Sequence, residues 1–93
     1  MSATPHSAEA FIVVDPVQDY CESLVIRGVY GSLPAARMAT PRVMRKVWRW
    51  EPHRAVEIQH WRGDESKTVA VFTPGRGWLN ATALAQWVEA ASR

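Results

Sequence analysis

The residues best suited to chemistry in this sequence are the cations gathered between residues 37 and 54. This segment holds six basic residues and one acid, a local charge of +5. Residues 1–36 carry −3, residues 55–93 are balanced, and the formal net charge is only +2. Because the positive charge is confined to one segment, its field is local and would attract an anionic surface. The segment therefore predicts either a binding site, which we pursue, or a basic face that is simply solvated.

Two tryptophans lie in the same segment and extend this prediction. In a helix Trp48 and Trp50 would point about 200° apart, so we expect one of them to be exposed. Arginine with tryptophan is typical of protein interfaces, and the same pair can bind phosphates and stack on bases. We expect the following residues to bind a partner: Arg37, Arg42, Arg45, Lys46, Trp48, Arg49, Trp50 and Arg54.

Catalytic and metal-binding patterns are weak in comparison. The three histidines, His6, His53 and His60, are dispersed and lack the spacing of a metal site. Cys21 is the only cysteine, and its acidic neighbours make it a poor nucleophile. We therefore predict a non-enzymatic protein with no metal and no cofactor. From the residues alone, the leading partner is a protein with an acidic surface, and the alternative is DNA or RNA bound by the 37–54 segment.

Length and composition limit the architecture to one small domain. The chain has 93 residues, of which 47% are hydrophobic, and five are tryptophans with large apolar surfaces. The first ten residues are small and polar, so we expect a flexible lead-in over 1–10 and a single domain over 11–93. The sequence leaves monomer and homodimer open.

A cytoplasmic location follows from the cysteine content and the apolar pattern. The single cysteine cannot form an internal disulfide, and no charged-then-apolar leader begins the sequence. The longest apolar run covers only residues 11–14, far short of the roughly 20 residues that span a bilayer. We therefore expect no membrane role.

Hydrophobic periodicity and turn residues predict an α+β fold of order ββαββα. Alternating apolar residues indicate strands, whereas Ser32 followed by Pro34 is typical of a helix start. We expect a four-stranded, mostly antiparallel sheet with two helices packed on one face. The expected strands cover residues 11–14, 23–30, 55–61 and 68–73, and the expected helices begin at residue 33 and near residue 80.

Two local features leave the middle of the chain less defined. Pro41 lacks an amide hydrogen, so the first helix should kink or end near Ala39, with Thr40 capping a new start. Residues 42–50 fit the pattern of an amphipathic helix, and we favour a helix that ends near Val47. An alternating strand fits the last residues of this segment almost as well. Gly28, inside a strand, indicates a bulge or a close contact from a neighbouring side chain.

Residues 11–62 resemble a class of short phage and mobile-element proteins of unknown function. The resemblance rests on Asp19, Tyr20, Gly28, Val29, Tyr30, Ser32, Ala35 and Ala36, and on VEIQHW at residues 56–61 as a later strand. It implies a fold and a genomic setting that includes anti-CRISPR-like inhibitors. It further implies a protein that binds and blocks a host macromolecular machine. The strand and helix expected after Asp64 depart from the pattern of this class.

Overall fold

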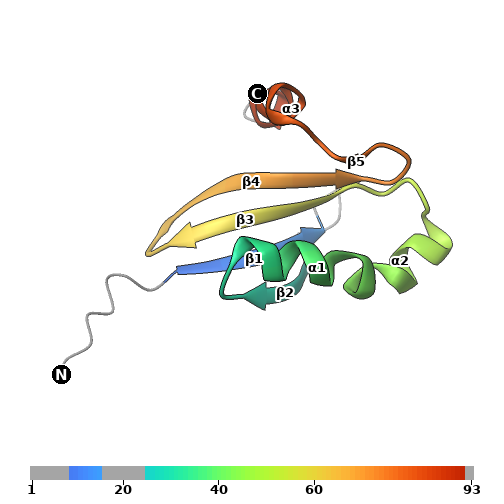
Figure 1. Ribbon diagram of the computed structural model, residues 1–93, viewed down its shortest axis with the longest axis horizontal. Helices are drawn as coiled ribbons and strands as arrows, with labels where there is room; N and C mark the ends of the chain where they lie inside the picture. The colour runs from blue at the N-terminus through green and yellow to red at the C-terminus, as the bar shows by residue number, and fades with distance from the viewer. Residues whose placement is uncertain (1–8, 16–24, 92–93) are drawn as a thin grey trace.

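Residues 9–15 and 25–91 are described by a computed structural model, in which an antiparallel sheet carries helices on both faces (Figure 1). The five strands lie in the order β2-β1-β3-β4-β5. The elements are β1 (Glu9–Asp15), β2 (Val25–Tyr30), α1 (Leu33–Val43), α2 (Arg45–Trp50), β3 (Val56–Arg62), β4 (Glu65–Thr73), β5 (Gly77–Trp78) and α3 (Ala81–Ala91).

The predicted α+β class is confirmed, with one strand and one helix more than expected. β5 has only two residues, too few for an alternating pattern to reveal it. The expected second half of the first helix is a separate helix, α2. β1 begins at Glu9, so residues 9 and 10 belong to the sheet and not to a lead-in. The predictions for residues 1–8 and 16–24, including His6 and Cys21, lie outside the described residues.

One face of the sheet and the first two helices enclose the main core. Ala36 is fully buried and Ala39 nearly so, and these small side chains let α1 lie close to the strands. Met44, between α1 and α2, is also fully buried. The buried residues of this cluster are Val13, Ala36, Met44, Val56, Ile58 and Ala70. The core thus fixes α1 and α2 against the sheet.

The opposite face of the sheet carries α3, which corrects the prediction of both helices on one face. Val14, Glu57 and Val71 form one row across the sheet and are all buried, although they point away from α1. Trp87 of α3 donates its indole N–H to Glu57 Oε2 at 2.7 Å, which places α3 over this row. Successive residues of these strands point to opposite faces, and buried residues occur on both. Both faces of the sheet are therefore covered by other elements.

The start of the first helix follows the prediction, and its end does not. Ser32 Oγ accepts a hydrogen bond from the Ala35 amide at 3.2 Å, as an N-cap does. The helix continues through Pro41 and breaks only at Met44. The Thr40 hydroxyl caps no new helix; it donates to the Ala36 carbonyl at 2.8 Å. α2 then runs to Trp50, so the helical alternative for residues 42–50 is the one found.

Gly28 combines both features that its position indicated. The pairing of β1 with β2 shifts between Val13 and Val14, whose partners are Gly28 and Ile26, so Arg27 is the extra residue of a bulge. The Tyr30 side chain lies across Gly28, and a Cβ atom added there would be 2.6 Å from the Tyr30 hydroxyl oxygen. Only glycine leaves room for this ring.

We expect Gly28→Ala to destabilise the protein by about 1–3 kcal/mol, because the partly buried Tyr30 ring must move out of the core. Unfolding in urea followed by tryptophan fluorescence measures the change. Gly31→Ala is the matched control, since no atom lies within 4 Å of its added Cβ. Equal losses of stability in the two variants would contradict the role assigned to Gly28.

Candidate binding surface

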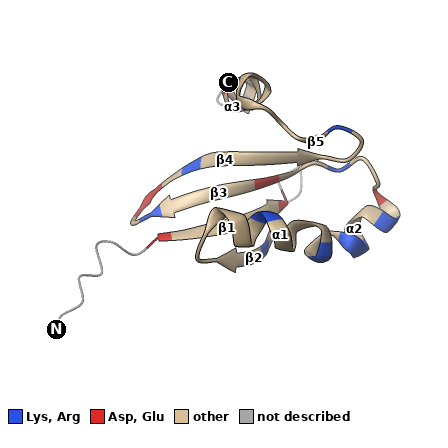
Figure 2. Ribbon diagram, in the orientation of Figure 1, with Lys and Arg blue, Asp and Glu red and all other residues tan. Residues whose placement is uncertain are grey.

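Exposed cations recur along α1 and α2, and we call them, together with the exposed apolar residues of the same two helices, the basic helix face. Figure 2 shows blue segments recurring along both helices to the far end of the molecule. Met38 and Trp50 belong to the same surface, and each is 82% exposed. The basic helix face consists of Arg37, Met38, Arg42, Arg45, Lys46, Arg49 and Trp50, all exposed. Each of these seven side chains, five cationic and two apolar, is exposed to solvent.

Most of the positive charge on this surface is not neutralised. Within residues 9–15 and 25–91, Arg42, Arg45, Lys46 and Arg49 form no ion pair with any acidic side chain. Arg37 instead lies over the ring of Trp78, with its guanidinium carbon 4.8 Å from the ring centroid. The basic helix face thus has a positive electrostatic potential that is complementary to a negatively charged partner.

The two tryptophans of the segment have different roles, as their helical spacing predicted. Trp48 is half-buried; its indole N–H donates to the Arg54 carbonyl at 2.8 Å and its ring lies 5.2 Å from that of Phe72. Trp50 is highly exposed and is not among the residues that pack in the core. Trp48 therefore anchors α2 to the sheet, and Trp50 is the tryptophan available to a partner.

Arg54 was predicted to bind, but the structure places it in an internal ion cluster. Its side chain is 13% exposed, and its Nε donates to Asp15 Oδ1 at 2.7 Å. A second guanidinium, that of Arg27, donates to Asp15 Oδ2 at 3.0 Å, and the Glu51 carboxylate also contacts Arg54. The cluster joins the end of β1, β2 and the connection from α2 to β3. Arg54 thus positions the basic helix face and is not part of it.

Met38 is the exposed residue that the sequence prediction missed. Its position four residues before Arg42 puts it on the same side of α1 as that arginine. Helical spacing could have found it, because a large apolar side chain between cations is unusual for a merely solvated helix. Its exposure adds apolar area to an otherwise charged surface.

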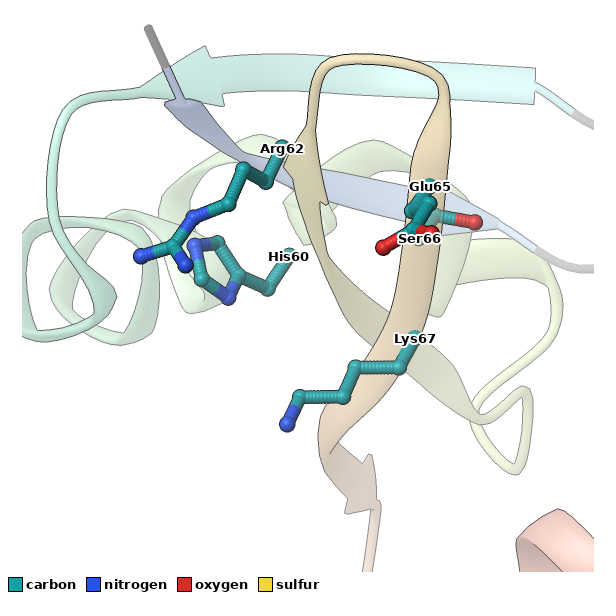
Figure 3. A pocket seen from close by; sticks show the side chains of 5 residues that line it. All are labelled: His60, Arg62, Glu65, Ser66 and Lys67. Carbon is teal, nitrogen blue, oxygen red and sulfur yellow. The ribbon is translucent and has the colours of Figure 1, made fainter. Parts of the chain in front are cut away.

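A hollow at the β3–β4 hairpin is a second candidate site (Figure 3). It encloses about 320 Å³ and is lined by His60, Arg62, Glu65, Ser66 and Lys67. His60 and Lys67 are directly opposite in the strand pairing, and their side chains extend to the same side of the hairpin as that of Arg62 (Figure 3). Cations on one side of a hollow are the arrangement expected of an anion site.

Neighbouring acids balance these cations. Glu9 lies 3.0 Å from the His60 Nε2 and 3.5 Å from Arg62, and the hydrogen bond with His60 is the main cause that lowers the pKa of the Glu9 carboxyl. The His60 ring is stacked on Phe11 with centroids 4.3 Å apart. Glu65 lines the hollow as well, so the two acids offset the charges of Arg62 and Lys67. The basic helix face, which has no such compensation, is the stronger candidate.

Among the described residues, no group of three or more histidine, cysteine, aspartate or glutamate side chains is arranged to hold a metal ion. None of the helices described is long and apolar enough to cross a membrane.

Comparison with known proteins adds no function. No protein-family model, curated protein or solved structure matches this chain. The geometry of the basic helix face therefore carries the functional argument.

Proposed function

We propose that this is a non-enzymatic binding protein whose basic helix face docks on an acidic surface of a protein partner. The supporting observation is that α1 and α2 carry exposed cations, four of which form no ion pair with a described acid, and two highly exposed apolar side chains, Met38 and Trp50. Arginine, tryptophan and methionine are enriched at protein interfaces relative to the rest of the surface. A face that contacted only phosphates would gain little from Met38.

The resemblance to short phage and mobile-element proteins extends this proposal to a biological role. A small protein of that setting would bind and block a host macromolecular machine. The build of the surface suits this role, because Trp48 and Arg54 fix α2 before any partner arrives. A preorganised surface loses little conformational entropy on binding, so a short helix pair can bind tightly.

Nucleic acid is the second candidate, and one observation favours it. The sequence from residue 33 to residue 50, which spans both helices, contains five cations and no acid. Phosphate groups along a backbone would meet only positive side chains there, and Trp50 could stack on a base. This alternative uses the same surface, so the two candidates differ in partner and not in site.

Affinity capture from a bacterial lysate distinguishes the candidates. The tagged protein is incubated with the lysate with and without nuclease, and bound material is identified by mass spectrometry. We expect a defined host complex to survive nuclease treatment. If every partner is lost with the nucleic acid, the protein-blocking function is wrong and the nucleic-acid alternative holds.

Trp50→Ala tests the apolar part of the surface. We expect affinity for the captured partner to fall by about tenfold to thirtyfold. This corresponds to a loss of up to about 2 kcal/mol of binding free energy, which is typical when an interface tryptophan is replaced by alanine. Gln86→Ala, at an exposed position of α3, is the control and should leave binding unchanged. Because Trp50 is exposed, its removal should not unfold the domain. Unchanged affinity after Trp50→Ala would remove this residue from the interface.

A further inference from the structure

The outermost strand of the sheet carries an unusual amount of exposed apolar surface. β2 is the last strand in the sheet order, and no described element pairs with its outer edge. Three of its six residues are exposed β-branched side chains: Val25 at 41%, Ile26 at 57% and Val29 at 61%. An uncovered edge strand of this composition offers free backbone groups and apolar side chains to another strand.

Lysine and proline, two residues that often protect an edge strand, are absent from β2, although the strand carries a bulge at Arg27. Proteins block such edges with lysine, proline or charges that point inward, and the sequence VIRGVY has neither lysine nor proline. Its one charged residue, Arg27, donates to Asp15 at 3.0 Å. The positive charge is therefore already compensated, and a second β2 strand would meet no unpaired cation at this edge.

The strand is complementary to itself. In antiparallel pairing about a two-fold axis between Arg27 and Gly28, Ile26 lies opposite Val29 of the second copy, and Val25 lies opposite Tyr30. The bulge at Arg27 makes this possible, because Ile26 and Val29 pair with Val14 and Ile12 and so share the face away from α1. Apolar β-branched residues that face each other across antiparallel strands stabilise the pairing.

We propose that a second copy of this chain pairs with the β2 edge in antiparallel orientation, which joins the two five-stranded sheets. A two-fold axis perpendicular to the sheet keeps α1 and α2 of both copies on the same face. The dimer then presents two basic helix faces on one side. A six-residue edge is short, so we expect a weak dimer that forms only as the protein concentration rises.

Sedimentation velocity over a concentration series, with the purified protein alone, tests the dimer. We expect wild type to shift from monomer to dimer as concentration rises, and Ile26→Lys and Val29→Lys to remain monomeric. Gln86→Lys is the control, because it adds the same charge at an exposed position of α3, which packs against β4, and should dimerise like wild type. A wild type that stays monomeric at millimolar concentration would overturn the proposal, as would dimers in both β2 variants.

Cross-linking tests the register independently of affinity. Ile26→Cys and Val29→Cys are prepared as separate proteins, each with Cys21→Ser, and oxidised alone or mixed. The proposed register predicts a disulfide-linked dimer mainly in the mixture, since residue 26 lies opposite residue 29. Equal cross-linking in the separate proteins would refute this register. Neither experiment includes a binding partner, so failure of the dimer leaves the basic helix face to be judged by its own binding tests.

Discussion

Reversing two charges of the basic helix face, Arg45→Glu with Arg49→Glu, should weaken partner binding by about a hundredfold or more. Both side chains are exposed and form no ion pair with a described residue, so their charge is available to the partner. Like charges brought together across an interface cost several kcal/mol, and about 2.7 kcal/mol corresponds to a hundredfold loss of affinity. Surface plasmon resonance with the captured partner measures the change.

The control for this experiment changes the net charge of the protein by the same amount, but at the other end of the molecule. Arg62→Glu with Lys67→Glu changes the hairpin, where acids already balance the cations, and should leave affinity within about threefold because distant charges are screened by salt. Thermal unfolding of both double variants should stay close to wild type. Equal loss of affinity in the two variants would mean that net charge governs binding and that the basic helix face is not a specific site.

The salt dependence of wild-type binding separates the two kinds of partner. If five cations contact phosphates of duplex DNA, the logarithm of the affinity should fall with the logarithm of salt concentration with a slope of about −4.5. An acidic protein surface releases fewer condensed counterions, and its slope should be shallower. This measurement uses the unaltered protein and does not depend on any variant.

Local features of the sequence predicted much of the fold. Ser32 and Pro34 placed the start of α1 because capping depends on residues within one turn. Alternation located four of the strands, and Gly28 indicated both its bulge and its close neighbour. The α1–α2 surface was also predictable in outline, because consecutive helical positions place its cations without any distant contact.

Contacts between residues distant in the sequence could not be predicted in this way. The position of α3 depends on Trp87 meeting Glu57, thirty residues earlier. Arg54 was counted among the binding cations, but its partner Asp15 lies 39 positions away and nothing in the spacing marks the pair. Buried ion pairs look like surface charges in a sequence, because composition shows the charge and not the burial.

The Asp15 cluster connects the stability of the sheet to the placement of the binding surface. Asp15 is 2% exposed and accepts from two guanidiniums that come from β2 and from the connection after α2. In the same connection, the Arg54 carbonyl accepts a hydrogen bond from the indole N–H of Trp48. Loss of the carboxylate should therefore both destabilise the fold and loosen the attachment of α2, which carries Arg45, Lys46, Arg49 and Trp50.

Asp15→Ala should lower the free energy of unfolding by about 3 kcal/mol, because it removes the buried carboxylate that pairs with two partly buried guanidiniums. Asp15→Asn keeps the shape and one acceptor, so the difference between the two variants separates the lost charge from the lost side chain. Urea unfolding at neutral pH measures both.

The matched control is Glu51→Ala, which removes the other carboxylate that contacts Arg54. Glu51 is 51% exposed and lies three residues from Arg54, so this pair is screened by solvent and its loss should cost no more than about 0.5 kcal/mol. Comparable destabilisation by Asp15→Ala and Glu51→Ala would show that burial does not distinguish the two acids. A large loss confined to Asp15 would identify its cluster as the contact through which β1 and β2 hold the basic helix face in position.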